Sequence, residues 1–97
     1  MIPYEVIEAK EILHEGMAEL LADVNRLKER MGIDRHDTVQ PISLVQQNLR
    51  VTLHNILGDS YNTMEDIQRL RQTFENARTY IRELETNHAG QLHSAGT

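Results

Sequence analysis

Hydrophobic residues recur at alternating spacings of four and three along the N-terminal part of the chain, which is typical of an amphipathic helix with a coiled-coil-like seam. Pro3 suits the first turn of such a helix because its missing N–H has no partner there, and Gly32 marks the end. Lys10 is the one polar interruption. The pattern predicts a helix over residues 4–31, with a seam of Val6, Leu13, Met17, Leu20, Val24, Leu27 and Met31.

Two more helices are predicted after a connector. Residues 33–40 are rich in Asp and have no hydrophobic period, so they read as a loop that ends at Pro41. A helix over 41–57 follows; it is the most apolar of the three, and we expect it to be the most buried. A third helix is predicted over 63–86, with Asn62 and Glu65 as a capping pair. Its seam consists of Ile67, Leu70, Phe74, Ala77, Ile81 and Leu84.

These elements predict an all-α fold, either a long helical hairpin or a three-helix arrangement with coiled-coil-like seams. Residues 1–88 would form a single helical domain, and residues 89–97, which have no period, a flexible tail. The first and third helices are longer than the second, so a closed bundle would leave apolar seam uncovered. We therefore expect a homodimer in which long helices pair.

Charge is distributed unevenly along the 97 residues. The formal net charge is −5, and Met1 to Asp23 contain six acidic residues against one base, Lys10. An acidic chain without a strong basic patch is a poor ligand for nucleic acid, so direct nucleic-acid binding is not expected. The sequence has no long apolar run, no signal-peptide pattern and no cysteine, so we expect a soluble cytoplasmic protein that does not bind a membrane.

A stripe of glutamates lies opposite the first seam at helical spacing and consists of Glu8, Glu11, Glu15 and Glu19. Such a stripe is either a solvated outer face, as on most amphipathic helices, or a docking face for a basic partner that imitates a nucleic-acid backbone. The sequence alone leaves both interpretations open.

Residues that could carry chemistry are few. Asp34, His36 and Asp37 lie together in the connector, but no partner motif accompanies them. The pairs Glu11-x-x-His14 and Glu85-x-x-His88 have the spacing used by di-iron helical bundles, yet the second helix offers no glutamate to complete such a site. We therefore predict no enzyme, no catalytic residue, no metal site and no cofactor, and keep a metal-binding helical bundle as a weak alternative.

The function favoured by the sequence is a non-enzymatic adaptor, small chaperone or regulator that sequesters a protein partner through its helical seams. The interface residues of this hypothesis are Leu13, Met17, Leu20, Val24, Leu27 and Met31 on the first helix and Ile67, Leu70, Phe74, Ile81 and Leu84 on the third. The alternative is an acidic inhibitor, of the kind encoded by phages, that blocks a basic nucleic-acid-binding surface of its target with the glutamate stripe.

Overall fold

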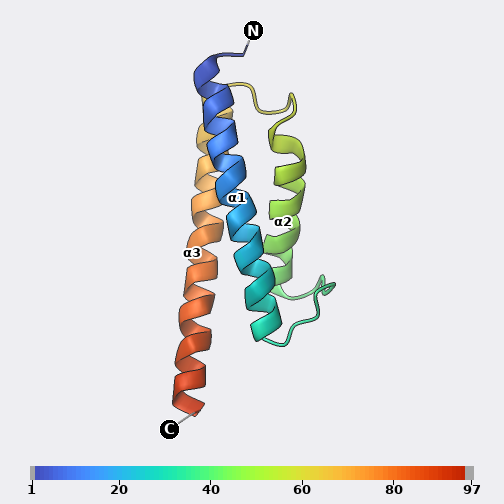
Figure 1. Ribbon diagram of the computed structural model, residues 1–97, viewed down its shortest axis with the longest axis vertical. Helices are drawn as coiled ribbons and strands as arrows, with labels where there is room; N and C mark the ends of the chain where they lie inside the picture. The colour runs from blue at the N-terminus through green and yellow to red at the C-terminus, as the bar shows by residue number, and fades with distance from the viewer. Residues whose placement is uncertain (1, 96–97) are drawn as a thin grey trace.

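Three helices account for most of the chain. The computed structural model describes the backbone of residues 2–95 and the side chains of residues 2–88. The helices are α1 (Tyr4–Arg30), α2 (Pro41–Ile56) and α3 (Met64–Ala95) (Figure 1). The prediction of an all-α, three-helix fold is confirmed, and no strand occurs in the part of the chain that the structure describes. No helix among the described residues is long and apolar enough to cross a membrane; the cytoplasmic location stays a prediction.

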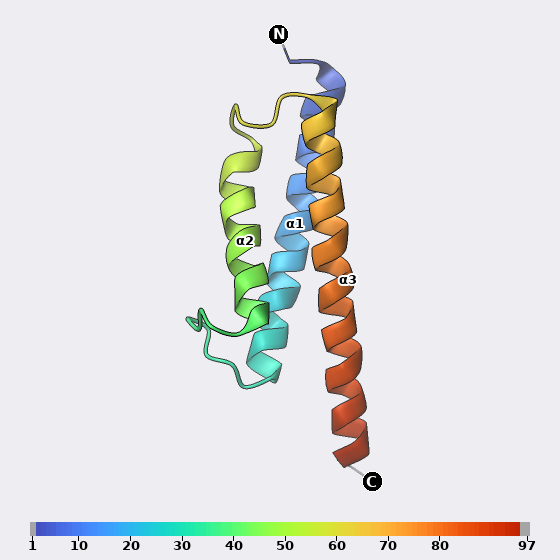
Figure 2. The same cartoon turned by 180° about the vertical axis from the view of Figure 1, so that it is seen from behind.

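α1 is the central helix. The chain descends along α1, returns along α2 and descends again along α3, as the two opposite views of Figures 1 and 2 show. α1 packs against both other helices, whereas α2 and α3 touch each other little. The expectation that α2 is the most buried helix stays a prediction, since five of its 16 residues are buried against eight of 27 on α1. Leu44 and Val51 of α2 are each about half exposed. α2 has a neighbour on one side only, so its outer apolar residues remain uncovered.

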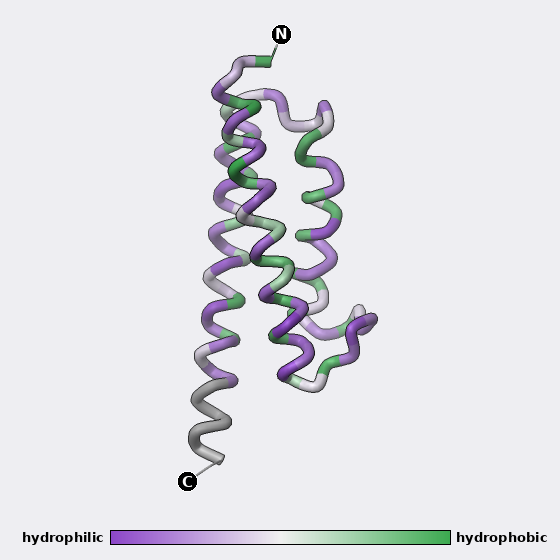
Figure 3. The backbone as a smooth tube through the Cα atoms, in the orientation of Figure 1, coloured by the Kyte–Doolittle hydropathy of each residue, from purple (hydrophilic) through white to green (hydrophobic). Residues whose placement is uncertain are grey.

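The core is built on the predicted seam of α1. Figure 3 shows hydrophobic and hydrophilic residues alternating along the helices, and the buried hydrophobic residues of α1 form one cluster with those of α2 and α3. The fully buried side chains include Val6, Met17, Val24 and Leu27 of α1, Ile42 and Ile56 of α2, and Ile67 and Ile81 of α3. Apolar burial of this kind is the main stabilising contribution in a fold without disulfides.

Lys10 lies within the buried seam because its long side chain reaches out of it. The residue is only 5% exposed, and its Nζ donates a hydrogen bond of 2.7 Å to the carbonyl oxygen of Gly58, just beyond the end of α2. The methylene groups pack in the core while the ammonium meets the negative end of the α2 dipole. The polar interruption of the seam is thus a contact between α1 and the second connector.

The end of α1 follows from Gly32. Its φ of +73° is the left-handed conformation that glycine adopts without strain. The N–H of Gly32 donates to the carbonyl of Glu29, and the N–H of Ile33 donates to the carbonyl of Lys28. This pair of bonds is a Schellman motif, which satisfies carbonyls that the helix leaves unpaired.

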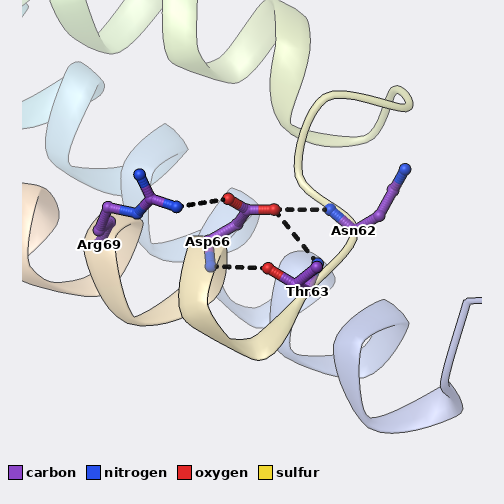
Figure 4. A network of polar contacts seen from close by, with 4 residues as sticks. All are labelled: Asn62, Thr63, Asp66 and Arg69. Carbon is purple, nitrogen blue, oxygen red and sulfur yellow. Dashed lines mark hydrogen bonds and ion pairs between the residues drawn. The ribbon is translucent and has the colours of Figure 1, made fainter.

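The start of α3 is capped by a different pair from the one predicted. The N–H of Asp66 donates to the hydroxyl of Thr63, and the N–H groups of Asn62 and Thr63 donate to the Asp66 carboxylate (Figure 4). Arg69 also donates to this carboxylate at 3.1 Å. The capping box is therefore Thr63 with Asp66, one residue further along than Asn62 with Glu65. Both pairs have the required spacing, and the first turn of the helix begins at Met64.

The C-terminal part of α3 runs past the other two helices. The helical backbone continues to Ala95, beyond the end predicted at residue 86, and the molecule is a rod of 59 × 23 × 16 Å. In both cartoon views this end of α3 projects below the end of α1. Much of the predicted tail, residues 89–97, thus has helical backbone, whereas residues 96 and 97 lie outside the described part. The flexibility of the tail stays a prediction.

Candidate functional site

The glutamates singled out in the sequence share one side of α1 and face solvent. Glu8, Glu11, Glu15 and Glu19 are all exposed. The first three lie away from the buried seam of α1, and Glu19 borders a groove between α1 and α3. The spacing of four and three that places apolar residues in the core places these carboxylates on the far side. The structure brings all four together on a single exposed surface.

No ion pair among the described residues involves these glutamates, although Arg71, Arg78 and Arg82 of α3 line the same groove as Glu19. Among residues 2–88, the ion pairs are Asp23 with Arg26, Asp66 with Arg69 and Glu75 with Arg78, and none involves the four glutamates. The one base of the segment, Lys10, is buried on the opposite side and bonded to Gly58. Carboxylates that share a surface without ion pairs produce a negative potential that attracts a basic partner.

Two large apolar side chains are exposed near the glutamates and were not predicted as site residues; the second of them, Ile12, also borders the groove between α1 and α3. Tyr4 is 74% exposed and Ile12 is 62% exposed. We call Tyr4, Glu8, Glu11, Ile12, Glu15 and Glu19 the outer face of α1. The sequence did contain a signal for Tyr4 and Ile12, since both are apolar and out of phase with the seam. Protein interfaces commonly combine such apolar anchors with a polar surround.

The predicted seam residues occupy a different place. Leu13, Met17, Leu20, Val24 and Leu27 are between 0% and 5% exposed, and Ile67, Leu70 and Ile81 between 0% and 6%. Met31, Phe74 and Leu84 are half-buried against the same core. The three helices therefore bury their seams against one another within the single chain. Homodimerisation through them stays a prediction.

The polar residues of the first connector shape the turn. Asp34 accepts a hydrogen bond of 2.7 Å from the N–H of His36. Asp37 accepts hydrogen bonds from the Ser43 hydroxyl at 2.7 Å and the Gln40 N–H at 2.9 Å, and these bonds, led by the one from Ser43, hold its pKa below the ordinary value. Asp37 thus accepts hydrogen bonds from Gln40, the N-cap residue of α2, and from Ser43 in its first turn. No group of three His, Asp or Glu side chains among the described residues is placed to hold a metal ion.

Comparison with known protein families identifies the family to which this three-helix chain belongs. The profile of the family described as bacterial epsilon antitoxin matches residues 2–84. The chain belongs to the epsilon antitoxin family. The match covers α1, α2 and α3 as far as Leu84. No curated protein and no solved structure matches this chain.

Membership of the epsilon antitoxin family settles the class of activity. The chain is a non-enzymatic protein that binds and neutralises a zeta toxin. The predictions of a non-enzymatic function and of a protein partner that is sequestered are confirmed at this level, and the partner is the cognate toxin.

Proposed function

We propose that the chain neutralises its zeta toxin by placing the outer face of α1 on a basic surface of the toxin. The observation that carries this proposal is the exposure of four glutamates on one side of α1 with no cation paired to them within the described residues. Opposite charge speeds encounter and fixes orientation, and exposed apolar groups add affinity once the surfaces meet. Tyr4 and Ile12 would be the apolar anchors.

The burial of the seams favours this surface over the seam residues. Val24 and Leu27 are fully buried, so a toxin could contact them only after α1 had separated from its neighbours. Exposing that core would cost free energy at about 25 cal/mol per Å² of apolar area, whereas the outer face of α1 is available without rearrangement. The acidic inhibitor is thus the better supported of the two hypotheses from the sequence.

The basic surface of the toxin is proposed to be one that otherwise binds phosphate groups of nucleic acid. Carboxylates at successive turns of a helix present negative charge at regular intervals, as a nucleic-acid backbone does. A short DNA duplex should then compete with the antitoxin for the toxin. Failure of the duplex to compete would remove this part of the proposal and leave the outer face itself untouched.

The test is capture of the purified toxin by variants with reversed charge. The variant Glu11→Lys, Glu15→Lys and Glu19→Lys should lose capture, because it presents positive charge to a basic surface. The matched control is Asp59→Lys, Glu65→Lys and Glu83→Lys, which makes the same change of net charge at exposed positions outside α1. Circular dichroism should show that both variants remain helical.

The two variants separate the outcomes. Loss of capture by the first and retention by the control supports the outer face of α1. Equal loss in both would show that net charge alone governs binding, and full retention by the first would contradict the proposal. Capture that also persists at high salt would instead favour the apolar seams as the interface.

A further inference from the structure

A lysine in the last turn of α1 is buried among uncharged hydrogen-bond acceptors. Lys28 is 1% exposed. Its Nζ donates to the side-chain carbonyl of Gln46 at 2.8 Å and to the backbone carbonyls of Arg35 and Asp37, each at 3.3 Å. No carboxylate of residues 2–88 forms an ion pair with it, and its charge interacts only at longer range with the Asp37 carboxylate, whose pKa it helps to lower. Lysine is rarely buried without an anionic partner, since desolvating a charge is costly.

A cavity of about 360 Å³ opens beside this lysine, between the last turns of α1, the first connector and α2. Its charged lining is positive overall, with three cations against the single carboxylate of Glu29. The polar side chains that line it are Asn25, Arg26, Lys28, Glu29, Arg35 and Gln46. Arg26 is already paired with Asp23, so Lys28 and Arg35 are the cations of this lining that form no ion pair with a described residue. The positive charge of this cavity contrasts with the formal net charge of −5 of the whole chain.

We propose that this cavity binds a small phosphate-bearing molecule, with the phosphate between Lys28 and Arg35. A volume of about 360 Å³ is in the range of sites for small molecules. All three N–H groups of the Lys28 ammonium are already donated, so a phosphate would replace one or both of the contacts at 3.3 Å. These contacts are long for a charged donor, which favours about 2.7–2.9 Å to an anionic oxygen. The Arg35 guanidinium can donate two parallel hydrogen bonds to a phosphate.

Gln46 would hold the site in shape. It is 3% exposed, accepts from Lys28 and donates to the Asn25 side chain, so it fixes the ammonium at the wall of the cavity. Arg35 lies on the connector, and its backbone carbonyl is already bonded to Lys28. A phosphate bound here would therefore join the connector to α1 and α2 and stabilise the folded chain.

The probe is inorganic phosphate, added to the full chain at constant ionic strength with chloride as the balancing anion. Phosphate should raise the melting temperature in a saturable way, by roughly 5–10 °C at ten times its dissociation constant. In ¹H–¹⁵N spectra the resonances that shift should be confined to residues 25–50. The outer face of α1 is not involved, so failure here leaves the proposed toxin interface unaffected.

Arg35→Gln is the informative variant because it removes a cation at an exposed position while its backbone carbonyl still accepts from Lys28. It should keep the melting temperature in chloride and lose at least tenfold in phosphate affinity. Arg71→Gln, an exposed arginine of α3, is the matched control and should bind phosphate as the original chain does. An absent or non-saturable rise, or equal affinity in Arg35→Gln and the original chain, would overturn the proposal.

Discussion

The ring of Phe74 on α3 lies directly over Gly16 of α1. A Cβ atom added to Gly16 would come within 3.0 Å of the ring's Cζ, so α1 and α3 approach closely at the one position of this turn that has no side chain. The Arg78 guanidinium lies 5.5 Å from the centroid of the same ring and is held by two hydrogen bonds to Glu75. The Cζ end of the ring thus meets the backbone of α1, and the guanidinium lies over the ring, an arrangement that favours cation–π attraction.

The effect of a substitution at Gly16 on the free energy of unfolding should depend on the size of the new side chain. Gly16→Ala adds a contact that the half-buried ring can relieve by a small outward shift, and alanine favours the helix by about 1 kcal/mol over glycine. The free energy of unfolding should therefore stay within about 1 kcal/mol of the original. Gly16→Leu should lower it by about 1–3 kcal/mol through overpacking. Urea denaturation measures both.

Phe74→Ala tests whether the ring causes the loss of stability expected for Gly16→Leu. Added to Gly16→Leu, it makes room for the leucine, so the double variant should lose less stability than the sum of the two single losses. Additive losses would show that the leucine is not strained against the ring.

The two buried lysines should differ in their contribution to stability. Lys28→Met removes the donor to Gln46, which is 3% exposed, and a buried acceptor left unpaired costs about 1–3 kcal/mol. Lys10→Met removes a single bond to Gly58, which is exposed, so water can replace it; the expected loss is below about 1 kcal/mol. Chemical denaturation of both variants checks the order. Equal losses would mean that the Gln46 amide finds another donor.

Much of the fold could be predicted because the apolar residues repeat at helical spacing. The predicted ranges 4–31 and 41–57 end one residue beyond the observed helices, since proline and glycine mark the boundaries. The end of α3 was missed because Gly90 and the small residues after Asn87 read as a tail, whereas the helical backbone continues to Ala95. The capping pair was misplaced by one residue because Asn62 and Thr63 are both good caps with an acid three residues on.

The arrangement in space could not be predicted in the same way. Periodicity identifies an apolar side but not what covers it, so the seams were equally compatible with an internal core and with an interface between chains. Lys10 and Lys28 could not be placed because their partners, Gly58 and Gln46, are distant in the sequence. The exposure of the four glutamates could be predicted because it follows from their spacing on the helix; their role in binding stays a prediction.

Neutralising the glutamates of the outer face should slow the association of the antitoxin with its toxin. Glu11→Gln, Glu15→Gln and Glu19→Gln keep the size of the side chains and remove their charge, so the association rate constant should fall roughly tenfold or more at low salt. The dissociation rate constant should change less, because exposed charges act mainly on encounter. Surface plasmon resonance at two salt concentrations measures both constants.

The apolar anchors provide the contrasting control. Tyr4→Ala and Ile12→Ala should raise the dissociation rate constant and leave the salt dependence of association unchanged. If the glutamine variant associated as fast as the original at low salt, the outer face would not steer the encounter.

Acid should weaken the start of α2 through Asp37. The bonds from Ser43 and Gln40 hold the pKa of Asp37 below its ordinary value of 3.8, so the folded state favours the ionised carboxylate more than the unfolded state does. The stabilisation is therefore fully present above pH 3.8 and is lost as the pH falls through the lower, folded-state pKa. The difference in unfolding free energy between the original chain and Asp37→Asn should be constant near neutral pH and shrink below pH 3.8. Asp59→Asn, at an exposed carboxylate without a hydrogen bond to any described residue, should show no such change; the same shrinkage in both variants would mean that acid acts through overall charge.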